Sequence, residues 1–206
     1  MFYPKRVPKV ADWLLPQCLW RKNDEAIYLT FDDAPSPCTL ELLEILDKCR
    51  AKATFFLVGE RIERYPDVAE LIVKSGHRIA NHSYSHRWDL KAEALRDEVL
   101  RTERLLRNLD PSSVAGEKLF RFPYGRFNFA KLRALSELGY VVVMWSLLSA
   151  DFDDRVSERE ILRLLRAARG GDIVVMHDLE KTITKLRAAL PIALAELSER
   201  HSFQTL

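Results

Sequence analysis

Short β-prone runs alternate with helix-patterned segments along almost the whole chain. The expected strands are 26–29, 54–58, 78–81, 119–122, 140–145 and 172–176, with 203–206 as a candidate seventh. The expected helices are 38–50, 61–75, 91–109, 129–138, 157–169 and 182–200. Because alternating strands and helices build βα units, this pattern predicts an α/β fold with a mostly parallel sheet. It is compatible with a closed barrel and with an open sheet.

A chain of 206 residues suits one domain with a sizeable core. No linker, repeat or low-complexity stretch divides residues 25–206, so we expect them to form a single domain. Residues 1–24 are interpreted as an N-terminal extension. We expect its large apolar side chains to pack onto the domain, since aromatic residues more often serve packing than binding; they are Trp13, Leu14, Leu15, Leu19 and Trp20.

Composition excludes several classes of function. The net charge is only +2, with both signs interleaved, which does not indicate a nucleic-acid partner. No apolar run reaches the roughly 18 residues that a membrane span needs. The N-terminal region lacks a clear signal-peptide core, and a cytoplasmic and a cell-envelope location both stay open. The spacing of Cys18, Cys38 and Cys49 indicates neither a disulfide framework nor a thiolate zinc site.

Polar side chains recur where the expected strands end. They are Asp32 and Asp33 after the first strand, His82 and His86 after the third, Arg121 and Tyr124 around the fourth, Asp151 after the fifth and His177 after the sixth. Each of these residues alone has an ordinary structural explanation. Because the carboxyl ends of parallel strands converge on one face, the shared position predicts an active site there.

His82 and His86 have the four-residue spacing that lets two imidazoles meet one ion when the segment turns helically. Together with a carboxylate from Asp32 or Asp33 they would give two histidines and one acid, a set that suits zinc or a similar divalent ion. His177 would be a ready general acid in such a site, because the usual pKa of histidine lies near neutral pH.

These segments resemble the motifs of the polysaccharide deacetylases (carbohydrate esterase family 4), which include chitin and peptidoglycan N-acetylglucosamine deacetylases. The resemblance runs from about residue 25 to the C-terminus. The matching segments are Thr30–Pro35, His82–His86, Arg121–Tyr124, Trp145–Phe152 and Val175–His177.

Three positions depart from the family pattern. Ala34 stands in place of glycine, Leu148 in place of an aspartate and Phe152 in place of a tryptophan. If the glycine requires a positive φ, Ala34 would be strained there. The other two departures bear on substrate preference more than on metal binding.

The resemblance implies a distorted (β/α)7 TIM-like barrel and a divalent metal ion, with zinc expected, held by Asp33, His82 and His86. It also implies the removal of N-acetyl groups from an N-acetylglucosamine-type carbohydrate, with release of acetate. The implied roles are Asp32 as general base, Arg121 orienting Asp32, a backbone N–H near Tyr124 holding the oxyanion, His177 protonating the leaving amine, Asp151 holding the charged form of His177, and Val175 and Met176 walling the acetyl pocket.

Two alternatives remain at this point. One is a metal-dependent hydrolase that acts on another non-peptide C–N bond. The other is a non-catalytic sugar-binding relative that has kept the fold. Every metal-ligand and proton-transfer position is filled, which argues against the second.

Overall fold

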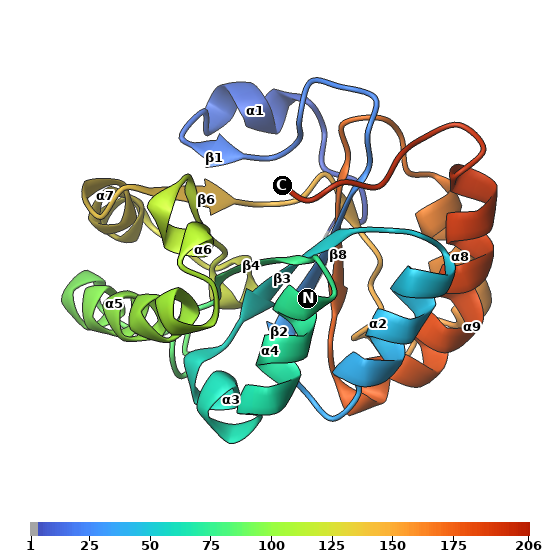
Figure 1. The fold of residues 1–206 in the computed structure, drawn as a ribbon. Helices are drawn as coiled ribbons and strands as arrows, with labels where there is room; N and C mark the ends of the chain where they lie inside the picture. Colours follow the sequence, from blue (N-terminus) through green and yellow to red (C-terminus); the bar gives the residue numbers. More distant parts are fainter. Residues whose placement is uncertain (1–3) are drawn as a thin grey trace.

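The computed structural model describes residues 4–206, whose strands form an eight-stranded sheet paired in parallel throughout. The strands are β1 (Cys18–Leu19), β2 (Tyr28–Ala34), β3 (Ala53–Leu57), β4 (Arg78–Asn81), β5 (Lys118–Phe120), β6 (Tyr140–Val143), β7 (Leu147–Leu148) and β8 (Ile173–His177). Their spatial order is β1-β6-β5-β4-β3-β2-β8-β7, and the sheet curls into a half-barrel (Figure 1).

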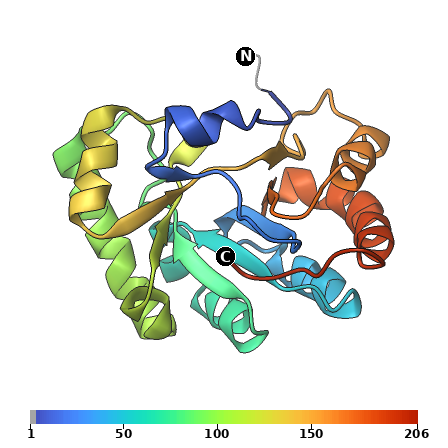
Figure 2. The ribbon, with the colours of Figure 1, turned by 90° about the horizontal axis from the view of Figure 1, so that it is seen from above.

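Most of the helices surround the outer side of the curled sheet, as Figure 2 shows from above. The helices are α1 (Val10–Leu14), α2 (Thr39–Lys48), α3 (Gly59–Arg64), α4 (Pro66–Lys74), α5 (Ala92–Leu109), α6 (Ser112–Ala115), α7 (Phe129–Glu137), α8 (Glu158–Arg166) and α9 (Glu180–Leu197), with a short 3₁₀ turn, η1, at Pro123–Gly125. The predicted α/β fold with a parallel, barrel-like sheet is confirmed.

Two details differ from the sequence-based expectation. The sheet gains β1 and β7, each of two residues, which are too short to leave a periodic signal. The candidate strand at 203–206 is reduced to a single bridge between Phe203 and Ile27. The expected helix at 61–75 is divided into α3 and α4, with Pro66 as the first residue of α4. The expected helix at 157–169 is α8, and the Ser157 side chain accepts a hydrogen bond from the N–H of Glu160 at its start.

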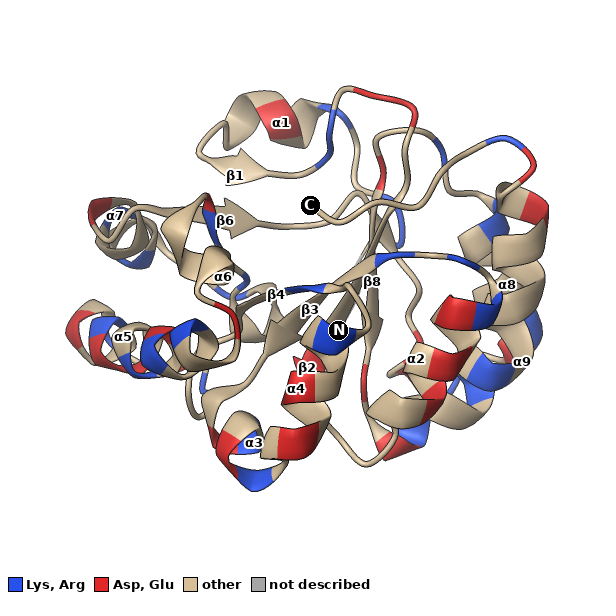
Figure 3. Ribbon diagram, viewed as in Figure 1, with Lys and Arg blue, Asp and Glu red and all other residues tan. Residues whose placement is uncertain are grey.

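Charged side chains gather on the helices. Lys, Arg, Asp and Glu alternate along α2, α4, α5, α8 and α9, whereas the strands carry few of them (Figure 3). Within residues 4–206 no helix is long and apolar enough to cross a membrane. The charge pattern therefore marks the outer side of the helices as the solvated side.

Strand β2 lies inside the sheet, between β3 and β8, and all seven of its residues are buried. The rings of Phe31 and Phe55 stack across β2 and β3 with centroids 5.0 Å apart. A strand buried on both sides carries apolar side chains on both faces, which is why Tyr28, Leu29 and Phe31 do not alternate regularly with polar residues. The buried strand fixes the position of the two acids, Asp32 and Asp33, at its carboxyl end.

The N-terminal segment joins the two ends of the sheet. The N–H of Val7 donates to the carbonyl of Ser146 and the N–H of Leu148 to the carbonyl of Lys5, so this part of the segment pairs beside β7. Strand β1, reached after α1, pairs with β6 at the other end. Residues 5–19 therefore lie across the opening of the half-barrel, as the blue segment in Figure 2 shows.

The expected packing of this segment is only partly correct. Trp20 is buried, and Leu15 and Leu19 are packed against core clusters. Trp13 and Leu14 are 79% and 60% exposed, so the prediction that they pack onto the domain is wrong. The reason is that α1 is a five-residue helix without a buried residue, and these two side chains point away from the sheet.

Candidate active site

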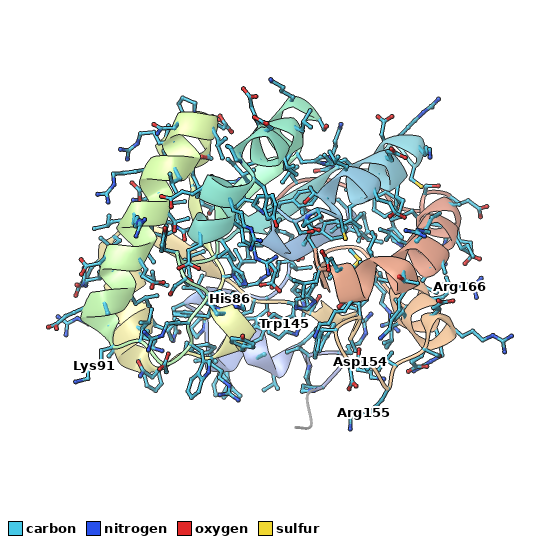
Figure 4. The ribbon with its side chains drawn as sticks, turned by 90° about the horizontal axis from the view of Figure 1, so that it is seen from below. His86, Lys91, Trp145, Asp154, Arg155 and Arg166 are labelled. Atoms are coloured by element: carbon cyan, nitrogen blue, oxygen red, sulfur yellow. The ribbon has the colours of Figure 1, made fainter. Side chains whose placement is uncertain are left out.

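A pocket of about 420 Å³ opens where the strands end at their carboxyl termini. Its lining includes six of the predicted polar residues: Asp32, Asp33, His82, His86, Tyr124 and His177. An apolar wall faces them, made of Trp145, Leu148, Phe152, Val175 and Leu179. Figure 4 shows this end of the molecule from below, with His86 and Trp145 close to its centre. The predicted convergence of strand ends thus brings these residues together.

Asp32 and Asp33 both line the pocket, although neighbouring residues of a regular strand point to opposite sides. The register between β2 and β3 shifts between Phe31 and Ala34, and Asp33 has a positive φ of 67°. Such an irregularity turns a side chain away from its regular direction. The local break in β2 therefore explains how two adjacent carboxylates serve one site.

Asp33, His82 and His86 form a set whose ligand atoms all lie within 4.8 Å of one another. Oδ1 of Asp33 is 2.9 Å from Nε2 of His86 and 3.9 Å from Nε2 of His82. Ligands of a tetrahedral zinc ion at about 2.0 Å lie roughly 3.3 Å from one another. The three side chains therefore fit a divalent ion without a large rearrangement.

The protonation of these residues also suits metal binding. Burial lowers the pKa of His82 to about 4, so its ring is neutral at neutral pH. Its Nδ1 lies 2.8 Å from the carbonyl of Arg121, which can only accept, so Nδ1 carries the proton and Nε2 offers a lone pair. Burial alone would raise the pKa of Asp33, but its hydrogen bond to His86 and the nearby histidines hold that pKa below the usual range.

Arg121 is a fully buried cation beside the ligand set. Its Nη1 donates to Oδ1 of Asp32 and to Oγ1 of Thr30, both at 2.7 Å, and its Nη2 donates to the carbonyl of Met144 at 3.0 Å. The guanidinium also lies over the ring of Phe56, 4.1 Å from the centroid. One oxygen of Asp32 is thereby fixed, and the other, Oδ2, lies 4.0 Å from Nε2 of His82.

His177 and Asp151 form a second pair on another side of the pocket. Nδ1 of His177 donates to Oδ1 of Asp151 at 2.8 Å, and the backbone N–H of His177 donates to Oδ2. Burial alone would lower the pKa of His177, but the buried Asp151 carboxylate, with further attraction from Asp33 and Asp32, raises it to about 9. The ring therefore holds a proton at neutral pH.

The two residues predicted to wall the acetyl pocket, Val175 and Met176, point to opposite sides of β8. Val175 lines the pocket together with His177 two residues later, whereas Met176 between them points into the hydrophobic core with no exposed surface. The prediction that Met176 walls the pocket is wrong, because adjacent strand residues face opposite sides. Tyr124 lines the pocket, with its ring centroid 4.8 Å from that of His86.

The three departures from the family motifs all lie at or beside the pocket. Ala34 is not among the residues with positive φ, so the alanine causes no backbone strain; the positive φ lies at Asp33 instead. Leu148 extends the apolar wall. Phe152 meets the His177 ring edge to face, with centroids 5.0 Å apart.

One buried acid at the site had no assigned role in the sequence analysis. Asp178 has no exposed surface and accepts hydrogen bonds from the hydroxyls of Ser36, at 2.6 Å, and Thr39. Its backbone N–H donates to the carbonyl of Asp32 at 2.8 Å. It therefore ties the turn after β2 to the end of β8. Its position directly after His177, at a strand end, was the only sequence signal for such a role.

Comparisons with known proteins agree on one family. The family model for polysaccharide deacetylase matches residues 21–143. A peptidoglycan-N-acetylglucosamine deacetylase of Bacillus cereus is 32% identical over 183 residues, which cover 86% of this chain and 84% of the relative. A chitooligosaccharide deacetylase of Bradyrhizobium is 34% identical over 156 residues, covering 74% and 70%.

Among solved structures, a mutant of a carbohydrate esterase family 4 pseudoenzyme of Bacillus anthracis, with restored enzymatic activity, has a TM-score of 0.78 and 28% identity. The match covers 91% of this chain and 68% of that chain. The fold is therefore shared with members of the family that differ in whether they are active.

The role of Asp178 yields a prediction. Asp178→Ala should lower the free energy of unfolding by about 2–4 kcal/mol, because two buried hydroxyls lose their acceptor. Asp178→Asn should lose less, since its amide oxygen still accepts one hydrogen bond. Denaturant unfolding followed by circular dichroism measures both. An Asp178→Ala protein within about 0.5 kcal/mol of the wild type would contradict the role.

Proposed function

The chain belongs to the polysaccharide deacetylase family, carbohydrate esterase family 4, and we propose that it removes N-acetyl groups from an N-acetylglucosamine-type saccharide, releasing acetate. The curated relatives named above are chitooligosaccharide and peptidoglycan N-acetylglucosamine deacetylases. The observation that carries the proposal is that a metal-ligand set, a carboxylate fixed by Arg121 and a histidine paired with Asp151 line one pocket. We assign the reaction to residues 25–206.

Deacetylases of this family use a divalent metal ion. In this chain we assign its binding to Asp33, His82 and His86, and we propose zinc because two imidazoles and one carboxylate are ligands that zinc prefers. When bound, the ion supplies a Lewis acid that polarises the acetyl carbonyl and makes water a better nucleophile. The remaining steps are carried by the side chains of the protein.

Asp32 is assigned as the general base. Its Oδ1 is held by Arg121, while its Oδ2 is directed toward the ligand set, where the attacking water would bind. Oδ2 would take a proton from that water as the new C–O bond forms. The hydrogen bond from Arg121 to Oδ1 fixes the orientation of the Asp32 carboxylate, and Oδ2 stays available to accept a proton.

His177 is assigned as the general acid. Because Nδ1 is bound to Asp151, the proton on Nε2 is the one that can be transferred into the pocket. Nε2 would protonate the amide nitrogen as the C–N bond breaks, so that the sugar leaves as an amine and the acyl group as acetate. Asp151 would stabilise the charged ring until the transfer occurs.

The remaining pocket residues are assigned to substrate positioning. The apolar wall, which includes Leu148 and Val175, would exclude water around the acetyl methyl group. Gly125 lets the Trp145 ring pack against the backbone at this point of the wall, because a Cβ at position 125 would lie 2.5 Å from Cη2 of Trp145. A backbone N–H near Tyr124 is the proposed donor to the oxyanion.

Two alternatives are kept as outcomes of the tests. A hydrolase of another non-peptide C–N bond would use the same metal and the same acid and base on a different substrate. The non-catalytic alternative has a precedent in the family, since one structural neighbour is described as a pseudoenzyme. The filled ligand set and both proton-transfer pairs favour an active enzyme here.

The first prediction concerns the metal. Purified protein should carry about one zinc ion per chain, and His82→Ala should reduce the content to below roughly one tenth, because it removes one of three ligands. His201→Ala serves as the control, since the His201 ring contacts the carbonyl of Glu25 and lies outside the pocket. Elemental analysis after gel filtration gives the stoichiometry. Full occupancy in His82→Ala would refute the ligand assignment.

The second prediction concerns proton transfer. Asp32→Asn and His177→Ala should each keep the metal but reduce kcat for acetate release by roughly two to four orders of magnitude, the usual span for acid–base catalysis. Acetate is measured enzymatically with N-acetylated saccharides. If both variants release acetate at nearly the wild-type rate, the two assignments are wrong. If the wild type itself releases none, another substrate class or the non-catalytic alternative gains support.

The pH dependence follows from the His177–Asp151 pair. A general acid must be protonated, so the rate should fall as the pH rises through the pKa of His177, which is about 9 without a metal and lower when a divalent cation lies nearby. In Asp151→Asn this alkaline limb should move to lower pH by about one unit or more, since the attraction that raises the pKa is lost. An unchanged limb would contradict the pairing.

A further inference from the structure

The two histidines of the ligand set are oriented in different ways. Nδ1 of His82 is held by the carbonyl of Arg121, and its side chain is only 2% exposed. The His86 side chain is 22% exposed, and within residues 4–206 its ring has one hydrogen-bonded contact, from Nε2 to Oδ1 of Asp33. An ion bound by His86 and Asp33 would replace that contact. The direction of the His86 ring therefore depends on the backbone that carries it.

That backbone belongs to a short segment between the two histidines, residues 83–85, here called the ligand loop. Ser83 at its start and His86 directly after it have positive φ values of 65° and 57°. This conformation is uncommon for residues other than glycine, and it persists where surrounding contacts hold it. The contacts of the ligand loop therefore decide where the His86 ring lies.

Glu98 of α5 accepts three hydrogen bonds from the ligand loop. Its Oε2 accepts from the backbone N–H of Tyr84 at 3.2 Å and from that of Ser85 at 3.0 Å. Its Oε1 accepts from the Ser85 hydroxyl. The remaining N–H of the loop, that of Ser83, donates to the Asn81 side chain at 2.9 Å. A single carboxylate thus holds the half of the loop that leads into His86, through hydrogen bonds that its charge strengthens.

The other side of the ligand loop packs against α3. The N–H groups of Gly59 and Glu60 donate to the carbonyls of Ser83 and Tyr84, both at 3.0 Å. A Cβ at Gly59 would collide with the Tyr84 ring, so the glycine permits this close approach. These hydrogen bonds come from the backbone of α3, whereas those from α5 come from the Glu98 side chain. Substitution of Glu98 therefore removes one side of the support and leaves the other in place.

We propose that Glu98 is a positioning residue for the metal site, because it holds the ligand loop so that His86 faces Asp33 and His82 before an ion binds. The inference rests on the proposed function, in which these three side chains bind a divalent ion. Glu98 does not line the pocket, so it acts through the loop and not on the substrate. A ligand that is ordered in advance loses less entropy when it binds.

The test measures the zinc Kd in competition with a chromophoric chelator, without substrate. Glu98→Met keeps a side chain of similar length but accepts no backbone hydrogen bond, so the Kd should rise about 10- to 100-fold, the usual effect of losing a group that orients a metal ligand. Glu98→Gln should stay within about 3-fold of the wild type, because its amide oxygen still accepts from both N–H groups. The matched control is Glu93→Met, which removes an exposed acid from the first turn of the same helix.

Three results of this comparison would overturn the proposal. They are an unchanged Kd in Glu98→Met, an equal rise in Glu93→Met, and a rise in Glu98→Gln as large as that in Glu98→Met, which would assign the effect to charge alone. If Glu98→Met does not fold, Glu98→Asp takes its place, since it keeps the charge but is one methylene too short to reach both N–H groups. Its Kd should rise about 3- to 10-fold, and an unchanged Kd would again contradict the role.

A double-mutant cycle separates positioning from a general loss of structure. In His86→Ala the ligand that Glu98 positions is absent, so adding Glu98→Met should change the zinc Kd by less than about 2-fold. A similar rise in both backgrounds would show that Glu98 only supports the fold, and the proposal would be wrong. If the wild type binds zinc but releases no acetate, the proposed function fails, and the Kd values still decide about Glu98. If the wild type binds no zinc, the ligand assignment and the role of Glu98 are both refuted.

Discussion

The fully buried guanidinium of Arg121 is the interaction on which the site depends. It pairs with Asp32 at 2.7 Å, and the carbonyl of the same residue accepts the proton of His82 Nδ1. One residue thus orients the proposed base and one proposed ligand. Removing one partner of such a buried pair typically costs about 3–5 kcal/mol. Its hydrogen bonds to Thr30 and to the carbonyl of Met144 connect it to β2 and to the residue after β6. The same side chain therefore links the strands of the sheet to the groups of the site.

The geometry of the sheet brings the other groups to this centre. Parallel strands present their carboxyl ends on one face. The last residues of β2 and β8 and the short segments after β4 and β5 supply the two acids, His177, the two histidines of the ligand set and Tyr124. Backbone irregularity completes the arrangement. Asp33, Ser83, His86 and Tyr124 all have positive φ, an uncommon conformation for residues other than glycine, and all lie in these segments. Such conformations persist where surrounding contacts over-determine them, and they gather at functional sites.

Much of the fold and of the site could be predicted from the sequence, because hydrophobic periodicity indicates which side chains are buried and the expected strand ends indicate where polar side chains converge. The parallel α/β fold and the convergence of the two acids with His82 and His86 followed from those signals, whereas the choice of Asp33 as the acidic ligand came from the family resemblance. Three features did not. The pairing of residues 5–19 with both ends of the sheet involves too few residues to show a period. The break in β2 that turns Asp33 toward Asp32 depends on tertiary contacts, and so does the role of Asp178. Met176 faces the core and not the pocket, because adjacent residues of β8 point to opposite sides.

The central claim is that one metal ion at Asp33, His82 and His86 supports deacetylation of an acetylated saccharide. The most direct measurement is the rate of acetate release from metal-free protein as zinc is added stepwise. Metal-free protein should release no acetate, and the rate should rise linearly with added zinc to a plateau at about one equivalent per chain. Full activity of the metal-free protein, or a rise that continues well beyond one equivalent, would contradict it.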